Sequence, residues 1–325
     1  MAAVPGLPLC ALETGPLETL EPMDGVLAWG ETEAVRAERV RSARPAAEGR
    51  SAEPGGGVSI ADALRAGARG SPEAASRANH KCLVLGALRE LGAALPGAAV
   101  IRTVRELDGH LAAGGARASP AGRWVLKAPH SAGGRLRVRG TGDVLLRPQR
   151  EGAARLLDLQ GEALFEPWME RDEDLGAVAE ARPGGVRILG RHRSLNTGGG
   201  VFRGIRVPPL AGDPGSLGVP DDAIRAAGRR VLLAGYKGMF GVDAWTYRDA
   251  AGDIALHPVG EINARFTFGA VAAALVERLR GAGAFPEDAP VIVRVGAAAP
   301  PPGSGAIPLL LPGDPDATQA WAESG

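Results

Sequence analysis

A short polar pattern near residue 260 has the residue types and spacing of a site for a metal and a phosphate. Glu261, Asn263 and Arg265 alternate with apolar residues, so on a strand their side chains point to the same side. Asp243 lies on the preceding long strand and can pair beside them. Two carboxylates and an amide oxygen form an all-oxygen set that suits Mg²⁺, and the Arg265 guanidinium suits a phosphate held by the metal. The alternative is a row of polar residues on an exposed sheet face.

The scarcity of lysine singles out a second segment. Only three of the 37 Lys and Arg residues are lysines, namely Lys81, Lys127 and Lys237. Lys127 ends an apolar stretch and is followed by a loop of small residues that contains Ser131, Gly133 and Gly134. Such a loop exposes backbone N–H groups that can approach phosphate oxygens, and a nearby ammonium adds positive charge. The alternative is a plain hairpin with glycine in its turn.

A third segment leaves a strand through Pro167, within the sequence Glu166-Pro-Trp168-Met169. A strand that ends in this way presents free backbone amides and carbonyls, which is what binding the polar edge of an adenine base requires. Asp174 follows a few residues later, and its carboxylate could accept hydrogen bonds from ribose hydroxyls. The alternative is a solvated acidic turn over residues 172–174.

Hydrophobic periodicity and turn residues place these segments on secondary-structure elements. An apolar stripe predicts a helix over 77–95, and Thr103-x-x-Glu106 is a capping box that predicts a second helix toward Leu111. Further helices are predicted from Asp221 to Gly235 and over 268–280, and a hairpin over 175–189. Strands are predicted at 100–101, 124–128, 144–146, 161–169, 239–247, 254–256, 259–263 and 291–293, and the stretch 194–220 is predicted to be rich in loops.

Composition excludes several classes of protein. Lys and Arg number 37, as do Asp and Glu, so the formal charge is zero and the basic excess that nucleic acid or an anionic membrane needs is missing. No uncharged apolar run approaches the roughly 18 residues of a membrane-spanning helix. Two cysteines without a CxxC motif, and no signal-peptide pattern, favour a cytoplasmic protein. Neither a Ser-His-Asp nor a Cys-His arrangement is indicated.

These segments, in their order along about residues 79–280, resemble the ATP-grasp family. The resemblance implies an α/β (α+β) fold in which two α+β subdomains clasp ATP, preceded by a short α/β N-terminal region. It implies a domain over 79–295, after a region over 1–78. The local pattern of that region predicts a strand at 26–30 and a helix at 31–41. Residues 296–325 would be a tail rich in Pro, Gly and Ala.

The resemblance also implies roles for the candidate residues, with ATP and Mg²⁺, or Mn²⁺ in its place, as cofactors. Lys81 and Lys127 would contact the ATP phosphates, and Arg265 would stabilise the transferred phosphoryl group, so Arg265 and Lys127 are the expected catalytic residues. Asp243, Glu261 and Asn263 would bind two Mg²⁺ ions. The remaining nucleotide contacts would come from Ser131, Gly133, Gly134, Glu166, Trp168, Met169 and Asp174.

The function implied is that of a ligase that phosphorylates a carboxylate and passes the acyl group to an amine or thiol, releasing ADP and phosphate. Its partners would be small-molecule carboxylate and amine substrates, without nucleic acid or membrane. Two alternatives stay open, namely a catalytically silent or regulatory ATP-binding protein and an ATP-grasp phosphotransferase.

Overall fold

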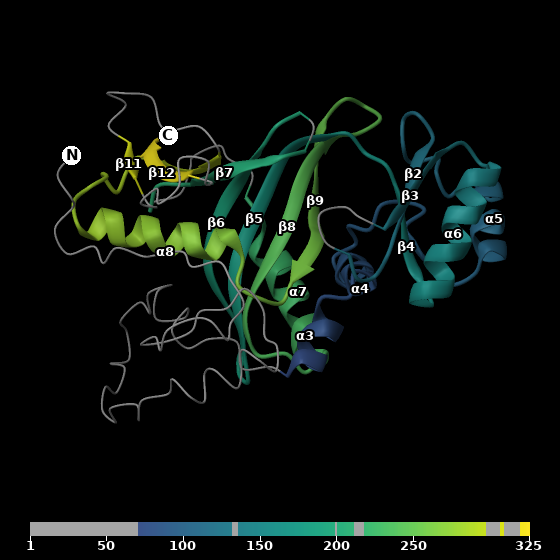
Figure 1. Cartoon of the computed structure of the whole chain (residues 1–325), viewed down its shortest axis with the longest axis horizontal. Helices are drawn as coiled ribbons and strands as arrows, with labels where there is room; N and C mark the ends of the chain where they lie inside the picture. The colour runs from purple at the N-terminus through teal and green to yellow at the C-terminus, as the bar shows by residue number, and fades with distance from the viewer. Residues whose placement is uncertain (1–70, 132–135, 199, 211–217, 297–305, 309–318) are drawn as a thin grey trace.

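The computed structural model describes residues 71–131, 136–198, 200–210, 218–296, 306–308 and 319–325. These residues form two lobes, each built on an antiparallel sheet (Figure 1). The small lobe has four strands in the order β1-β4-β2-β3, and the large lobe has eight in the order β11-β12-β10-β7-β6-β5-β8-β9. Helices packed on antiparallel sheets confirm the expected α+β class.

The small lobe occupies residues 99–167. Its elements are β1 (Ala99–Ile101), α5 (Val104–Ala112), β2 (Arg123–Lys127), β3 (Arg137–Thr141), α6 (Arg147–Gln160) and β4 (Ala163–Pro167). On β2, Trp124 and Leu126 are buried in one cluster with Leu107 of α5 and Leu156 of α6. Alternation along the strand therefore turns Lys127 to the opposite face, toward the large lobe. Both helices lie on the outer side of this sheet (Figure 1).

The helix α5 begins at the expected cap. The Thr103 hydroxyl accepts a hydrogen bond from the Glu106 N–H at 3.0 Å. The Glu106 carboxylate, however, accepts from the N–H of Arg102 at 2.7 Å, one residue earlier than the reciprocal bond of a capping box. Both bonds satisfy backbone donors at the helix entrance, and they fix the turn between β1 and α5.

The large lobe is built from both ends of the described chain. Its elements are α3 (Pro72–Ala78), α4 (Cys82–Glu90), β5 (Arg171–Arg182), β6 (Gly185–Asn196), β7 (Phe202–Val207), α7 (Asp221–Leu233), β8 (Gly238–Arg248), β9 (Ile254–Asn263), α8 (Phe268–Gly281), β10 (Val291–Gly296), β11 (Ile307–Pro308) and β12 (Gln319–Ser324). β12, in the region expected to be a tail, pairs antiparallel with β10. No described helix combines the length and apolar character needed to cross a membrane.

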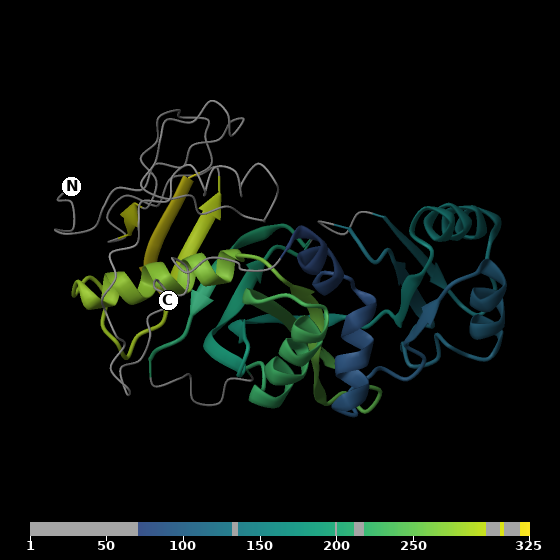
Figure 2. The same ribbon diagram turned by 90° about the horizontal axis from the view of Figure 1, so that it is seen from below.

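The two faces of the large sheet carry different residues. Phe240 and Val242 of β8 are buried in one cluster with Ile224 of α7, so α7 covers one face. Asp243 and Trp245 alternate with them and face the other way. On that second face α8 packs over β5, β6 and β7, so the two helices lie on opposite sides of the sheet (Figure 2).

Several predicted elements differ from those observed. The helix predicted over 77–95 corresponds to the shorter α4, and a turn at 79–81 separates it from α3, which ends at Ala78. The strand predicted at 144–146 is wrong, because this stretch leads into α6, which the sequence analysis did not find. The loop-rich stretch 194–220 contains β7, and the strands at 254–256 and 259–263 are one strand, β9. The strand at 26–30 and the helix at 31–41 lie outside the described residues.

Candidate active site between the two sheets

The expected metal-binding residues lie side by side on the large sheet. In the register of β8 and β9, Asp243 stands opposite Glu261 and Gly241 stands opposite Asn263. Directly opposite residues of an antiparallel pair point to the same face, so the three polar side chains share one surface. The Asn263 Nδ2 donates a hydrogen bond to the Asp243 Oδ2 at 2.9 Å. The structure thus brings together two carboxylates and an amide from distant parts of the sequence.

The two carboxylates influence each other electrostatically. Crowding by protein atoms and the nearby Glu261 carboxylate raise the pKa of Asp243 to about 6, while the hydrogen bond from Asn263 and the charge of Arg265 oppose this rise. Residue Asp243 is nevertheless exposed to solvent, which limits how far desolvation can raise its pKa. Two neighbouring carboxylates that are open to water, together with an amide oxygen, form a donor set that fits a hard divalent cation such as Mg²⁺.

Lys81 links the loop after β2 to this row. It lies in the turn between α3 and α4, and its Nζ donates to the Glu261 Oε1 at 2.7 Å. The same ammonium donates to the backbone carbonyl of Ser131 at 2.9 Å. The structure therefore places Lys81 and Ser131 beside Asp243, Glu261 and Asn263, the row of expected metal ligands that is called the metal row below. Gly133 and Gly134 lie outside the described residues.

Lys127 and Glu166 form a buried ion pair on the small sheet. Lys127 is on β2 and Glu166 is on β4. The Glu166 side chain is only 3% exposed. Burial alone would raise the pKa of Glu166, but the Lys127 ammonium and the His257 ring outweigh it and hold that pKa well below its usual range. His257 comes from β9 of the large lobe, with its Nε2 3.6 Å from the Glu166 Oε1. The two lobes therefore meet at this ion pair.

In the segment expected to bind adenine and ribose, residues 166–174, only some of the polar groups are free of hydrogen bonds to the protein. The Trp168 N–H donates to the Arg123 carbonyl at 2.8 Å, and its carbonyl accepts from the Ser119 hydroxyl at 2.8 Å. The backbone of Met169, by contrast, makes no hydrogen bond within the part of the chain that the structure describes. Asp174 accepts from Arg171 at 3.0 Å and from Asn196 at 2.7 Å. Of the expected backbone contacts, Met169 is thus the more available.

Arg265 follows directly after β9. Its N–H donates to the Asn263 carbonyl at 2.9 Å, a tight turn that holds the residue next to the metal row. Its guanidinium forms no ion pair with another described residue, although its charge acts on Asp243. Arg265 therefore has a positive charge that is available for an anionic ligand.

Sequence reasoning missed two residues on this surface, His257 and Trp245. The Trp245 and His257 rings stack at a centroid distance of 4.4 Å, and the residues stand opposite each other on β8 and β9. Both are buried, and the ring nitrogens of His257 have no hydrogen-bond partner among the described residues. Alternation offered a signal for Trp245, because it stands two residues after Asp243 on the same strand.

His192 occupies the same face further from the lobe junction. It stands opposite Gly176 of β5, which in turn stands opposite Asp243. A Cβ on Gly176 would lie 2.3 Å from the His192 Nε2, and a Cβ on Gly269 of α8 would lie 2.2 Å from its Cε1. Both glycines thus make room for the ring, and burial lowers the pKa of His192 to about 4. Its Nδ1 has no partner among the described residues.

Solved structures with a similar fold were found. Biotin carboxylase from Campylobacter jejuni, solved as a β-γ-ATP complex, matches with a TM-score of 0.54 at 14% identity over 80% of this chain and 65% of that one. N5-carboxyaminoimidazole ribonucleotide synthetase from Thermus thermophilus matches with a TM-score of 0.50 at 14% identity over 78% of this chain and 70% of that one. An ADP complex of an N5-carboxyaminoimidazole ribonucleotide synthetase gives a TM-score of 0.44 at 13% identity over 69% of this chain.

The two structures with TM-scores of 0.54 and 0.50 define the class of fold. The chain has the ATP-grasp fold, as the sequence resemblance implied. It spans 58% of the last of the three structures and 65% of the biotin carboxylase. No protein-family model matches the sequence. No curated protein matches it either.

Proposed function

We propose that the chain is an ATP- and Mg²⁺-dependent ligase that activates a carboxylate as an acyl phosphate and passes the acyl group to an amine or thiol. The observation that carries this proposal is the meeting of the two sheets. Glu166 of the small sheet, which pairs with Lys127, has its Oε1 3.6 Å from the Nε2 of His257 of the large sheet. The row of Asp243, Glu261 and Asn263 lies on the same face of the large sheet as His257.

ATP would bind between the lobes. Lys127 and Lys81 would contact its phosphates, and the loop containing Ser131, Gly133 and Gly134 would cover them. The free backbone of Met169 would bind the adenine edge. Three further groups would complete the nucleotide contacts. These are the Glu166 side chain, the second lone pair of the Trp168 carbonyl, and the Asp174 carboxylate near the ribose. The ion-pair partners of Lys127 and Lys81 are carboxylates, so phosphate oxygens would offer these ammonium groups partners of the same negative charge.

Asp243, Glu261 and Asn263 would hold two Mg²⁺ ions, whose charge would neutralise the phosphate oxygens. Glu261 now accepts a hydrogen bond from Lys81, so it would exchange this ammonium for the metal. Lys81 would then be free to turn toward the phosphates. The fit depends on the oxygen donors of the row, which are those that Mg²⁺ prefers.

In the reaction, a carboxylate oxygen of the substrate would attack the γ-phosphorus of ATP, and the bond from that phosphorus to the bridging oxygen would break to release ADP. An amine would then attack the acyl carbon, release phosphate and lose a proton. The residues needed are those that position the reactants and stabilise negative charge on the transferred phosphoryl group. Arg265, with no ion pair to another described residue, and Lys127 have the charges for this task.

The experiment is an ATP-turnover screen against pooled amino acids and other carboxylates, with hydroxylamine present as the acceptor. We expect one or more acids to yield a hydroxamate together with ADP and phosphate. AMP and pyrophosphate as products would contradict the mechanism. Nucleotide binding without turnover across a broad set of acids and amines would favour a silent ATP-binding protein instead.

A further inference from the structure

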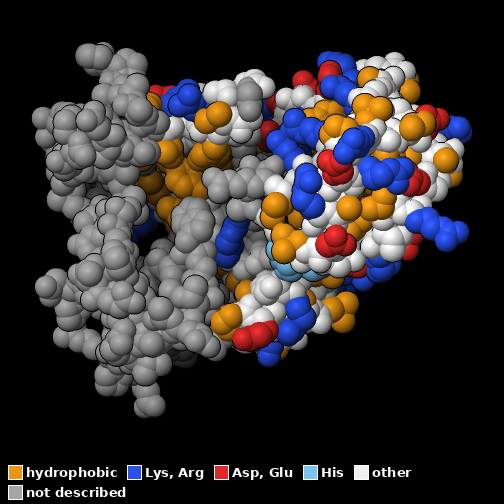
Figure 3. Space-filling view, turned by 45° about the vertical axis from the view of Figure 1, so that its right-hand side comes forward, with side chains coloured by type: hydrophobic (Ala, Val, Ile, Leu, Met, Phe, Trp, Pro, Cys, Tyr) orange, Lys and Arg blue, Asp and Glu red, His pale blue; other side chains and the backbone are white. Residues whose placement is uncertain are grey.

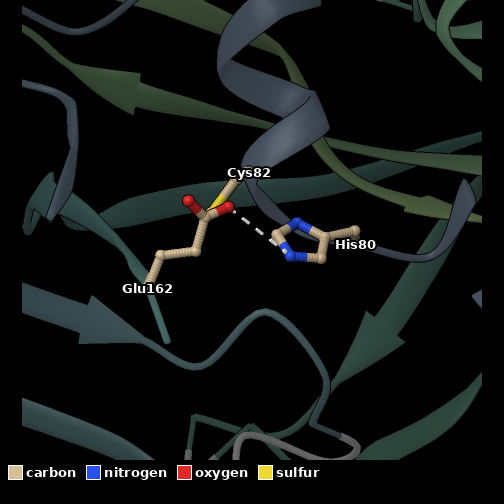
Figure 4. Close-up of side chains that lie close together, drawn as sticks. All are labelled: His80, Cys82 and Glu162. Atoms are coloured by element: carbon tan, nitrogen blue, oxygen red, sulfur yellow. Dashed lines mark ion pairs between the residues drawn. The ribbon is translucent and has the colours of Figure 1, made fainter. Parts of the chain in front are cut away.

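A second cluster of metal-ligating side chains lies outside the candidate active site. His80, Cys82 and Glu162 each offer one ligand atom, and these atoms lie within 4.8 Å of one another (Figure 4). The His80 Nε2 is 3.6 Å from the Glu162 Oε1. The Cys82 sulfur points toward the same carboxylate. All three residues are half-buried, so a small ion could reach them from solvent.

The cluster joins the two lobes. Cys82 begins α4, which packs against α7 and β9 of the large lobe. Glu162 belongs to the small lobe, where Gly161 ends α6 with a φ of 77° and turns the chain into β4. A ligand shared by these residues would therefore connect the large lobe to the small one at a point separate from the ion pair of Lys127 and Glu166.

The Glu162 carboxylate is held in place by an ion pair with an arginine of the small lobe. Its Oε2 forms an ion pair with the Arg102 guanidinium at 3.0 Å, while its Oε1 faces His80. The His80 ring is supported from the side by His130, whose ring centroid lies 5.0 Å away in an edge-to-face arrangement. Histidine side chains reach the surface beside the small lobe in Figure 3. Neighbouring groups that hold the ligand side chains in place, as Arg102 holds Glu162 and His130 packs on His80, are a feature of protein metal sites.

The donor set selects the kind of metal. One imidazole nitrogen, one thiolate sulfur and one carboxylate oxygen suit a borderline-soft cation such as Zn²⁺ better than Mg²⁺, which prefers oxygen alone. Ligand atoms around tetrahedral Zn²⁺ lie about 3.3–3.8 Å apart, given bonds of about 2.0–2.3 Å. The three side chains would thus have to draw together by about 1 Å, a movement that side-chain rotation can supply.

We propose that His80, Cys82 and Glu162 bind a Zn²⁺ ion, with water in the fourth position, and that the bound ion ties the small lobe to the large lobe. Burial and the Glu162 carboxylate raise the pKa of the Cys82 thiol to about 12, so this thiol is protonated without metal. On binding, the S–H bond breaks, a Zn–S bond forms, and the proton leaves to solvent. The proposal does not depend on the ligase activity.

The test is a titration with Co²⁺, which replaces Zn²⁺ and gives a near-ultraviolet charge-transfer band when a thiolate binds it. Excess Mg²⁺ is present throughout, so that the oxygen donors of Asp243, Glu261 and Asn263 are occupied. The variants are Cys82→Ser, Glu162→Gln and His80→Gln, and Cys10→Ser is the matched control because it removes the other cysteine of the chain. Circular dichroism checks that each variant is folded.

We expect one Co²⁺ per chain, with the band retained in Cys10→Ser and lost in Cys82→Ser. Glu162→Gln and His80→Gln should each weaken binding at least about tenfold, the lower end of the loss for perturbed metal sites. Added Zn²⁺ should displace Co²⁺ and raise the unfolding temperature of the wild-type chain but not of Cys82→Ser. A band that is missing in the wild type, or that disappears in Cys10→Ser while persisting in Cys82→Ser, would overturn the assignment and leave an ordinary ion-pair network.

Discussion

The ion pair of Lys127 and Glu166 should contribute to stability, since the Glu166 side chain is almost fully buried. Replacing Lys127 by Met leaves a buried carboxylate without its partner, which costs on the order of 3–5 kcal/mol of the free energy of unfolding. Adding Glu166→Gln should recover most of this loss, because the unpaired charge is then gone. Urea denaturation of the two single variants and the double variant measures these effects. Equal stability of Lys127→Met and wild type would show that the pair is not formed in solution.

Arg265 has no ion-pair partner among the described residues, so its expected contribution is to the transition state rather than to the fold. Arg265→Ala should lower kcat more than it raises KM for ATP. The guanidinium would stabilise negative charge on the transferred phosphoryl group mainly in the transition state, so its loss affects the rate more than ground-state binding. Steady-state kinetics with an acid identified in the turnover screen measures both constants, and the unfolding temperature serves as the control. A change confined to KM would assign Arg265 to ground-state binding.

His192 gives the fold a pH dependence of known sign. Its pKa in the folded chain is about 4, below the value of 6.5 expected when unfolded. Between these values the unfolded chain binds the proton and the folded chain does not, so stability is fully present above about pH 6.5 and declines as the pH falls toward 4. The loss reaches about 3 kcal/mol at most, at about 1.4 kcal/mol per pKa unit. Unfolding free energies at pH 7 and 4.5 should differ less in His192→Gln than in wild type, and an equal difference in the two proteins would contradict this assignment.

At the level of elements, α8 can pack on the large sheet because Gly176 of β5 and Gly269 of α8 leave room for the His192 ring. Gly176→Ala should destabilise the chain by about 1–3 kcal/mol, because its Cβ would overlap the buried His192 ring. Combined with His192→Ala, the same substitution should cost clearly less, since the ring is then absent. Gly109→Ala in α5 is the matched control, because nothing lies within 4 Å of its Cβ and alanine favours a helix. Additive effects of the two substitutions would show that the ring is not held against Gly176.

The elements that the sequence predicts well are those with strong local patterns. Alternation along 239–247 and the row from Glu261 to Arg265 predict the strands and the shared face on which Asp243, Glu261 and Asn263 lie. The turn that separates α3 from the helix predicted over 77–95 depends instead on a distant contact. The Asn79 side chain accepts from the N–H of Ala264 at 2.8 Å and donates to the carbonyl of Ala75 at 2.8 Å, and it thereby ends α3.

The contacts between lobes could not be predicted from the sequence. His257 of β9 meets Glu166 of β4, residues whose local patterns carry no information about each other. The same holds for Lys81, which reaches both Glu261 and Ser131 from the turn between two helices. Such contacts depend on how two separately built sheets face each other, and only the assembled fold settles this.

At the scale of the whole molecule, the metal row should be required for turnover and not for folding. Glu261→Gln keeps the size of the side chain but removes one of the two carboxylates, so we expect ATP turnover to be abolished and the unfolding temperature to change little. Activity measured over a range of Mg²⁺ concentrations separates a weakened site from a lost one. Wild-type activity at limiting Mg²⁺ would make the row structural.

We expect Mg²⁺ and ATP to bind together between the two sheets. Calorimetric titration with a non-hydrolysable ATP analogue, with and without Mg²⁺, tests it without knowledge of the acid or the acceptor. We expect one site per chain in the wild type that needs Mg²⁺ for full affinity. Lys127→Ala, checked for folding, should weaken binding by about 1.5–3 kcal/mol, as expected for a lost hydrogen bond to a charged group. Failure of the wild type to bind, or equal affinity in the folded Lys127→Ala variant, would contradict the account.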